Sequence, residues 1–232
     1  MSISDLTLTP VHGSGRVTAG ARFLVVFDVD STLIEDEVIE LIADYAQVRE
    51  QVAEVTERAM RGELDFDGSL RERVALLRGI SLDQISRVRE RIRVTRGVPE
   101  TISAIHAAGG RVGAVSGGFH EVLDPLAEEL DLDLWRANRF EVTEEGELTG
   151  EVSGTIIGRQ SKQHTVRSWA QSLDVPIDRV ITVGDGANDL GMMEIAGLSV
   201  AFDAKPIVRQ EAAVSLPSRD MTQLLSLLGL RG

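Results

Sequence analysis

The 232-residue chain contains no cysteine, so it forms neither a disulfide bond nor a cysteine-ligated metal site. Aromatic residues make up only 4% of it, which disfavours platforms for base stacking. No apolar run approaches the roughly 20 residues of a membrane-spanning helix. The first residues lack the basic start and apolar core of a secretion signal. A cytoplasmic protein without a membrane anchor is therefore the default expectation.

Positive charge is also scarce, because 24 Lys and Arg residues face 37 Asp and Glu residues and the net charge is −13. A negative field repels nucleic acids and anionic membranes, so we expect neither as a partner. A small anionic substrate would require a local exception to this field. A cation, a lysine or a set of backbone amides would have to supply it.

Short apolar runs alternate with helical patterns through most of the chain. Runs rich in Val end at Asp28, Ser116 and Asp185, and a weaker run covers residues 198–202. Continuous apolar runs are typical of strands buried on both faces. Their alternation with helices predicts an α/β fold with a Rossmann-like, doubly wound parallel sheet. Alternating residues at 138–154 predict an additional β-hairpin.

Residues 35–94 interrupt this alternation, because they carry four helical patterns in succession, one of them with Ser81 as its expected N-cap. Four helices are too many for an ordinary crossover between strands. We therefore expect a small helical cap domain at 35–94, inserted after the first strand into a core domain of residues 21–34 and 95–232. Residues 1–20 are interpreted as a flexible leader.

Polar residues follow three predicted strands, at Asp28, Ser116 and Asp185. Ligands of open parallel sheets bind at the carboxyl ends of the strands, so these residues should share one edge. The Asp28 carboxylate is suited to attack phosphorus and become an acyl phosphate. Asp30 would protonate the leaving group, since crowding by other carboxylates raises a carboxyl pKa. An ordinary acidic turn is the alternative interpretation.

A second acidic segment contains Asp185 and Asp189, and its two glycines allow close backbone approach. With Asp28 and Asp30, four carboxylates would meet at one sheet edge and repel one another by several kcal/mol per pair, an order-of-magnitude figure for an effective dielectric constant of about 20. Magnesium prefers oxygen ligands and would relieve this repulsion. The alternative is a structural loop that leads into a helix near residue 190.

Two features suit a phosphate group. Ser116, Gly117 and Gly118 combine a hydroxyl with amides at an expected helix start, although a tight turn before a helix has the same composition. Lys162 lies at the start of a helix expected over 162–173, where its charge opposes the helix dipole. An anion facing Lys162 would remove this conflict, whereas an exposed surface lysine is the ordinary alternative.

The order of these segments resembles the haloacid dehalogenase superfamily of phosphotransferases. The residues concerned are DVDST at 28–32, SGG at 116–118, a downstream lysine and GDGAND at 184–189, and the pattern spans about residues 22 to 205. The helical insertion is similar to that of the superfamily's phosphoserine phosphatases. This resemblance implies hydrolysis of O-phospho-L-serine to L-serine and phosphate, the last step of serine biosynthesis, through an aspartyl phosphate.

The resemblance also implies roles for individual residues. Asp28 would be the nucleophile and Asp30 the general acid and base. Magnesium would be held by the side chains of Asp28 and Asp185 and the carbonyl oxygen of Asp30, while Asp189 would orient Lys162 or the metal shell. The core residues expected to bind substrate are Ser116, Gly117, Gly118, Lys162 and Asn188.

Substrate selection is implied in the cap, at Glu37 and Arg73, with Met60 and Phe66 as pocket walls. Phosphoserine carries an ammonium and a carboxylate, which a glutamate and a guanidinium would bind. Taken alone, Glu37 and Arg73 are ordinary surface residues of helices.

Three other functions use the same core residues. A phosphotransferase would pass the phosphate to another alcohol such as homoserine, and another small-molecule phosphomonoesterase would release a different alcohol. A signalling receiver would keep the phosphorylated aspartate as its output, but it needs neither a helical cap nor Asp30. The oligomeric state is left open, a homodimer included.

Overall fold

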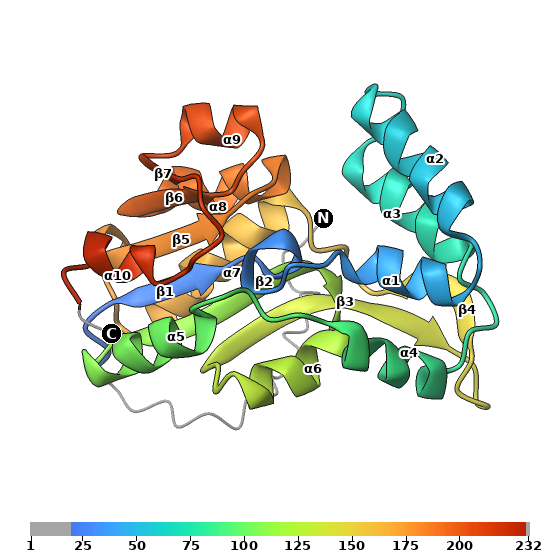
Figure 1. Ribbon diagram of the computed structural model, residues 1–232, viewed down its shortest axis with the longest axis horizontal. Coiled ribbons are helices and arrows are strands. Elements are labelled where there is room, and N and C mark those ends of the chain that lie inside the picture. The colour runs from blue at the N-terminus through green and yellow to red at the C-terminus, as the bar shows by residue number, and fades with distance from the viewer. Residues whose placement is uncertain (1–19, 231–232) are drawn as a thin grey trace, which may run out of the picture.

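The computed structural model describes residues 20–230, the side chain of Met60 excepted (Figure 1). Apart from Gly20, the predicted leader at 1–20 lies outside the described residues. Seven strands form one sheet in the order β4-β3-β2-β1-β5-β6-β7, in which only β3 and β4 pair antiparallel. The strands are β1 (Leu24–Phe27), β2 (Arg111–Phe119), β3 (Leu134–Val142), β4 (Leu148–Ser153), β5 (Val180–Gly184), β6 (Leu198–Phe202) and β7 (Val214–Leu216).

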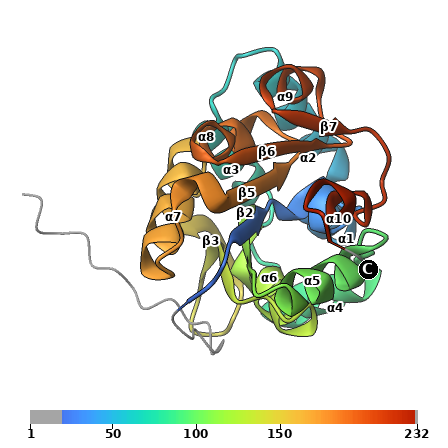
Figure 2. The same ribbon diagram turned by 90° about the vertical axis from the view of Figure 1, so that its left-hand side faces the viewer.

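Helices cover both faces of the sheet (Figure 2). The helices are α1 (Val38–Tyr45), α2 (Arg49–Met60), α3 (Phe66–Ala75), α4 (Leu82–Val88), α5 (Val98–Ala107), α6 (His120–Glu129), α7 (Arg159–Ser172), α8 (Leu190–Ile195), α9 (Pro206–Glu211) and α10 (Gln223–Leu227). The short helical turns are η1 (Val29–Leu33), η2 (Arg89–Arg91), η3 (Ile177–Arg179) and η4 (Ala187–Asp189). The predicted doubly wound α/β sheet with a hairpin is confirmed.

The central strand β1 shows why the apolar runs form buried strands. All four of its residues are inaccessible to solvent. Because side chains alternate along a strand, Val25 and Phe27 pack with α5 and α6 on one face, whereas Leu24 and Val26 pack with α7 on the other. Burial on both faces therefore requires the continuous apolar run that the sequence shows.

The four helices predicted between the first two strands are α1 to α4. Ser81 caps α4 through a capping box: Gln84 N donates to Ser81 Oγ at 3.2 Å, and Ser81 N donates to Gln84 Oε1 at 2.9 Å. The helical segment joins the core through a short bridge between Ile34 and Val94. Antiparallel main-chain pairing at this bridge fixes where the chain leaves the core and returns to it.

A second attachment links this helical segment to the hairpin of β3 and β4. Leu148 N donates to Ile80 O at 2.8 Å, Gly79 N donates to Leu148 O at 2.9 Å, and Leu82 N donates to Gly146 O at 2.9 Å. The side chain of Leu148 is buried at this attachment. The helices α1 to α4 are therefore tied to the sheet at two separate places.

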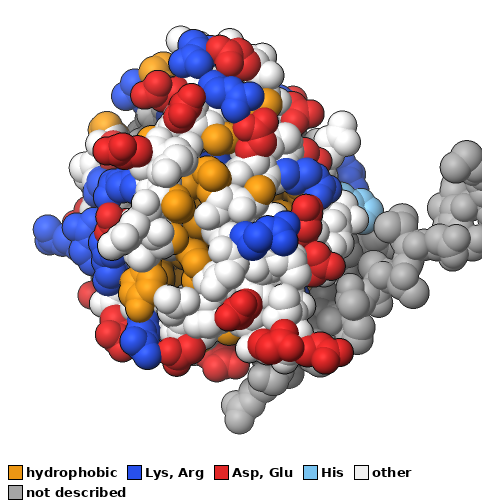
Figure 3. Space-filling model, turned by 90° about the vertical axis from the view of Figure 1, so that its right-hand side faces the viewer, with side chains coloured by type: hydrophobic (Ala, Val, Ile, Leu, Met, Phe, Trp, Pro, Cys, Tyr) orange, Lys and Arg blue, Asp and Glu red, His pale blue; other side chains and the backbone are white. Residues whose placement is uncertain are grey.

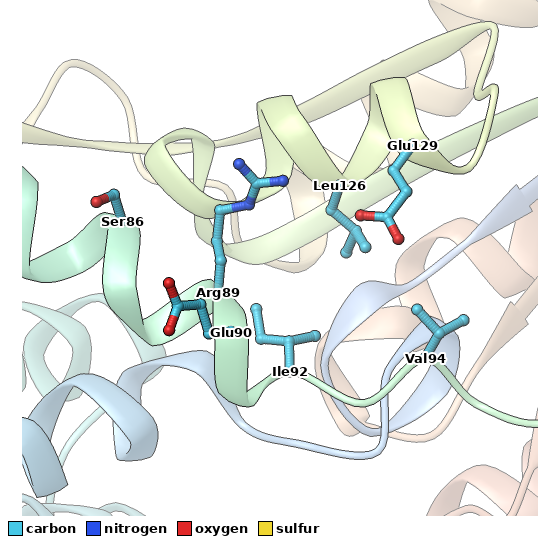
Figure 4. Close-up of a pocket in the computed structure, with 7 residues that line it drawn as sticks. All are labelled: Ser86, Arg89, Glu90, Ile92, Val94, Leu126 and Glu129. Atoms are coloured by element: carbon cyan, nitrogen blue, oxygen red, sulfur yellow. The ribbon is translucent and has the colours of Figure 1, made fainter.

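The surface around α1 to α4 and β4 mixes both signs of charge around a strip of apolar side chains (Figure 3). A separate hollow of about 510 Å³ lies between α4, η2 and α6 (Figure 4). Arg89 extends from η2 toward α6, and the apolar side chains of Ile92, Val94 and Leu126 line the hollow beside it. None of the residues predicted for catalysis lines this hollow.

Within residues 20–230 no helix combines the length and apolarity needed to cross a bilayer.

Candidate active site

The carboxyl ends of β1, β2 and β5 meet at one edge of the sheet, because β1 lies between the other two strands. Asp28 directly follows β1, and its N–H donates to Val183 O of β5 at 2.8 Å. Asp185 directly follows β5. A cavity of about 610 Å³ opens at this edge, lined by both aspartates and by residues of α1, α2 and α3. The geometry therefore places the strand ends and the helical segment around one space.

Three carboxylates cluster beside this cavity. Oxygen atoms of Asp28, Asp185 and Asp189 lie within 4.8 Å of one another, and all three residues are buried. Burial, together with the charge of Asp189, raises the pKa of Asp28 well above its ordinary value and the pKa of Asp185 to about 6. Asp189, and not Asp30, supplies the third carboxylate of this cluster. The atom of Asp30 that we expect to bind a metal ion is its main-chain carbonyl oxygen. This donor set fits a hard divalent cation, which would offset the repulsion.

Lys162 is inaccessible to solvent. Its Nζ donates to Asp28 Oδ1 and, at 2.7 Å, to Asp189 Oδ1. Burial by itself lowers the pKa of Lys162, but the charges of Asp189 and Asp28 outweigh it and raise the pKa above its ordinary value. Lys162 is therefore charged and buried, so its interpretation as an exposed surface lysine is wrong. Its helix begins three residues earlier than predicted, at Arg159.

Asp189 organises the acidic loop. Its Oδ1 accepts from Lys162, while its Oδ2 accepts from Asp185 N at 3.1 Å and Gly186 N at 3.0 Å. A Cβ atom at Gly184 would stand 2.4 Å from Asp189 Oδ2, so only glycine fits there. One carboxylate thereby fixes both the lysine and the main chain that presents Asp185.

Asp30 lies in the turn η1, and its carboxylate faces the first residue of α1. Val38 N donates to Asp30 Oδ1 at 3.0 Å. Burial and the nearby charge of Glu37 raise the pKa of Asp30 to about 7. A carboxyl group with this pKa exchanges its proton near neutrality, as a general acid and base requires.

Ser31 adopts a left-handed conformation (φ 57°), which is uncommon for a residue with a side chain. Three hydrogen bonds hold it there. Its N–H donates to Asp36 O at 3.2 Å, its Oγ donates to Glu37 Oε1 at 2.8 Å, and its carbonyl oxygen accepts from Arg219 Nη2 at 2.9 Å. Ser31 lies in η1, between Asp30 and the start of the helical segment. This strained turn positions Asp30 close to the end of β1.

Ser116, Gly117 and Gly118 lie within the last residues of β2, rather than in a turn after it, and α6 begins at His120. Ser116 Oγ accepts from Gly118 N at 2.7 Å. A Cβ atom at Gly118 would stand 3.0 Å from both Asp30 Oδ2 and Ser116 Oγ. This close approach explains the glycine at position 118.

The side chain of Phe66 reaches this strand end from the start of α3. A Cβ atom at Gly117 would stand 3.1 Å from Phe66 Cζ and 3.8 Å from Asn188 Nδ2. A Cβ atom at Gly158 would stand 3.2 Å from Phe66 Cδ1. Phe66, Gly117 and Asn188 all line the cavity. The ring of Phe66 therefore closes the space between α3 and the core.

Glu37 and Arg73 line the cavity from the side of the helical segment. Arg73 is half-buried, and its Nε donates to Ser69 O at 3.2 Å. Burial lowers the pKa of Arg73, which the charges of Glu37 and Asp30 oppose. Met60 is the last residue of α2, and its side chain lies outside the described part of the structure.

Several residues at the site were not predicted. Thr32 Oγ1 donates to Asp185 Oδ1 at 3.4 Å. Asn138 is buried and joins two strand-end segments, since its Nδ2 donates to Gly117 O at 2.8 Å and Ile157 N donates to its Oδ1 at 2.7 Å. Lys205 lines the cavity and follows β6. The apolar pattern of this strand is weak, so the sequence does not indicate a functional residue at its carboxyl end.

Comparison with known proteins agrees with this geometry. The chain is 50% identical over 212 residues to the phosphoserine phosphatase of Streptomyces coelicolor, a match that covers 90% of this chain and 51% of that protein. It is 45% identical over 205 residues to the phosphoserine phosphatase of Streptococcus thermophilus, covering 88% of this chain and 95% of that protein. The chain thus spans about half the length of one relative and nearly all of the other.

A solved structure described as a phospho-aspartyl intermediate analogue of phosphoserine phosphatase superposes with a TM-score of 0.84. It is 38% identical in sequence, and the match covers 90% of this chain and 99% of that one. Residues 25–194 match the sequence model of the haloacid dehalogenase-like hydrolases. This match includes the strand ends that carry Asp28, Ser116 and Asp185. The chain belongs to the haloacid dehalogenase-like hydrolase family.

Proposed function

We propose that the chain is a phosphoserine phosphatase, which hydrolyses O-phospho-L-serine to L-serine and inorganic phosphate in the cytoplasm, as the last step of serine biosynthesis. One observation carries the proposal: a single cavity joins Asp28 and Asp30 to Glu37 and Arg73. Phosphate chemistry and recognition of an amino acid thus share one site. The relatives that carry this name support the same substrate.

In the first half of the reaction, a carboxylate oxygen of Asp28 forms a bond to phosphorus while the bond from phosphorus to the serine oxygen breaks. Lys162 fixes Oδ1 of Asp28, so we assign the attack to Oδ2. Asp30 donates its proton to the departing serine oxygen, which is consistent with its pKa of about 7. The solved phospho-aspartyl analogue of a relative supports an acyl phosphate on Asp28.

In the second half, the Asp30 carboxylate takes a proton from water, and the water oxygen bonds to phosphorus. The bond between phosphorus and the Asp28 oxygen then breaks, which releases phosphate and restores both side chains. Ser116, Gly117, Gly118 and Asn188 would bind the phosphate oxygens beside Lys162. Asp189 would hold Lys162 in place, as its 2.7 Å hydrogen bond indicates.

We infer that Mg²⁺ is the cofactor, held by the carboxylates of Asp28 and Asp185 and the carbonyl oxygen of Asp30. When bound, the ion would neutralise part of the charge on the carboxylates and on the phosphate. The buried carboxylates of Asp28 and Asp185 lie close enough to share one ion.

The amino-acid end of the substrate would lie between α1 and α3. Glu37 would accept from the ammonium group, and Arg73 would donate to the carboxylate. Because Arg73 is half-buried, a bound carboxylate would compensate part of its lost hydration. Phe66 and Met60 would form the walls. We therefore propose that residues 35–94 act as a cap on a core of 21–34 and 95–232.

The Asp28→Asn variant tests the nucleophile. The amide has the same shape but is not nucleophilic, so phosphate release from phosphoserine should fall to a trace while the fold is kept. Turnover above a trace would refute the assignment of Asp28. Phosphate release from a panel of small phosphoesters, with and without Mg²⁺, tests the substrate and the cofactor. Phosphohomoserine formed in the presence of homoserine would instead indicate a phosphotransferase.

A further inference from the structure

Lys205 is a basic residue that the proposed mechanism does not use. It follows β6 and precedes Pro206, the first residue of α9. β6 is the neighbour of β5, so the segment after β6 opens at the same sheet edge as Asp185. The exposed side chain of Lys205 lines the cavity together with Asp28 and Asp185.

The main chain holds Lys205 firmly beside the acidic loop. Its N–H donates to Asp185 O at 3.0 Å, and its carbonyl oxygen accepts from Val208 N at 3.0 Å and Arg209 N at 3.1 Å. Pro206 further restricts the backbone at the start of α9. The base of the side chain is thus fixed beside Asp185, while the side chain itself is exposed.

The other cations around the cavity are more constrained. Lys162 is shared between two carboxylates, and Arg159 pairs with Glu194 at 2.9 Å. Arg73 lies on the side of the helical segment. Within residues 20–230, Lys205 forms no ion pair with a carboxylate, although its charge lowers the pKa of Asp185 and so opposes the effect of burial there. Among the cations on the core side of the cavity, Lys205 is therefore the one that no ion pair holds away from an incoming anion.

We propose that Lys205 is a phosphate-recognition residue at the mouth of the cavity, where its ammonium group contacts a non-bridging oxygen of the entering phosphate monoester. The inference rests on the proposed function, since it assumes a phosphate ester as substrate. A chain with a net charge of −13 repels such an ester, and acidic side chains such as Glu40 and Asp65 also line the cavity. Lys205 supplies attraction where the ester enters, above the buried Lys162.

Four proteins test this role: the parent chain, Lys205→Ala, Lys205→Arg and the control Arg209→Ala. Arg209 lies on the same helix α9 and is exposed, so its removal changes the net charge equally without touching the cavity. Each protein is assayed with Mg²⁺ on phosphoserine and on an aryl phosphate. Binding of inorganic phosphate is measured by calorimetry.

Lys205→Ala should raise KM for both esters, and the dissociation constant of inorganic phosphate, by the same factor of about five, as expected for a solvent-accessible charge pair. The kcat should stay within about twofold, because Lys205 acts mainly on binding. Lys205→Arg should restore most of the affinity, and Arg209→Ala should behave like the parent. Added salt should shrink the difference between Lys205→Ala and the parent.

Three results would overturn the role of Lys205. The first is an unchanged KM and phosphate affinity in Lys205→Ala, and the second is an equal loss in Arg209→Ala. The third is a loss confined to phosphoserine, which would place Lys205 at the amino-acid end. If the parent releases no phosphate from phosphoserine, the proposed function fails separately. Phosphate binding by calorimetry still decides whether Lys205 binds phosphate.

Discussion

Chelation of divalent cations should destabilise the folded chain more as the pH rises. Burial and the charge of Asp189 raise the pKa of Asp185 from 3.8 to about 6, and burial and the charge of Glu37 raise that of Asp30 to about 7. A carboxyl group with a raised pKa binds its proton more tightly in the folded than in the unfolded chain, so its ionisation opposes folding. The free energy of unfolding of the metal-free protein should therefore fall between about pH 4 and about pH 7.

The magnitude follows from the pKa of Asp185. One pKa unit corresponds to about 1.4 kcal/mol, so a rise from 3.8 to about 6 makes ionised Asp185 unfavourable by about 3 kcal/mol. Relaxation around the charge reduces this value, and we expect about 2 kcal/mol. Asp185→Asn keeps the shape and an acceptor for Thr32 but carries no charge. The metal-free variant should therefore be more stable than the parent by about 2 kcal/mol at about pH 7.5, and nearly equal at about pH 4.

Urea unfolding followed by circular dichroism measures this difference. Parent and Asp185→Asn are dialysed against a chelator and unfolded at several pH values, then again with Mg²⁺. Magnesium should stabilise the parent and leave the variant almost unchanged, because the variant lacks one of the proposed ligands. A parent whose unfolding free energy does not depend on pH in the chelator, or a variant less stable than the parent there, would refute the reasoning.

Three further predictions concern single residues. Lys162→Met should lower the free energy of unfolding by about 3–5 kcal/mol at about pH 7.5, because it leaves Asp28 and Asp189 buried without their cation. Urea unfolding should show a smaller loss at about pH 5, because burial raises the pKa of Asp28 and its carboxylate takes up a proton more readily there. Arg73→Ala should lower kcat/KM for phosphoserine by about 10- to 100-fold and spare an aryl phosphate; an equal loss on both substrates would exclude Arg73 from substrate selection. Gly118→Ala should lower kcat at least about tenfold with little change in thermal stability. The added Cβ would stand 3.0 Å from Asp30 Oδ2 and displace this carboxylate from its position. An unchanged kcat would show that the end of β2 relaxes to accommodate the methyl group.

The sheet and the helical segment were predictable because burial leaves a plain signature in both. Strands covered on both faces need continuous apolar runs, and all four residues of β1 are indeed buried. The helices α1 to α4 carry apolar residues at helical spacing, and Ser81 marks the start of one of them. The short edge strand β7 (Val214–Leu216) was not predicted, since three residues with an exposed centre give no periodicity.

Depth within the fold was less predictable than element type. Lys162 lies on a helix whose composition is polar, and its burial depends on β1, α7 and the acidic loop meeting in space. The extent of β2 was also missed, because glycines that end a strand and glycines that continue one look alike in sequence. The sequence does not mark Lys205 as a site residue, because a lysine before a proline is an ordinary helix start.

The buried charges explain why this site is costly to fold. Lys162 compensates one of the three clustered carboxylates of Asp28, Asp185 and Asp189, so two negative charges remain without a partner within this group. A divalent cation carries the opposite charge, and its binding would convert the repulsion into folding free energy. Neutral replacements at Asp185 would relieve the same repulsion permanently, but they would remove a proposed metal ligand. The carboxylates that the apolar core tolerates least are therefore those that the proposed reaction requires.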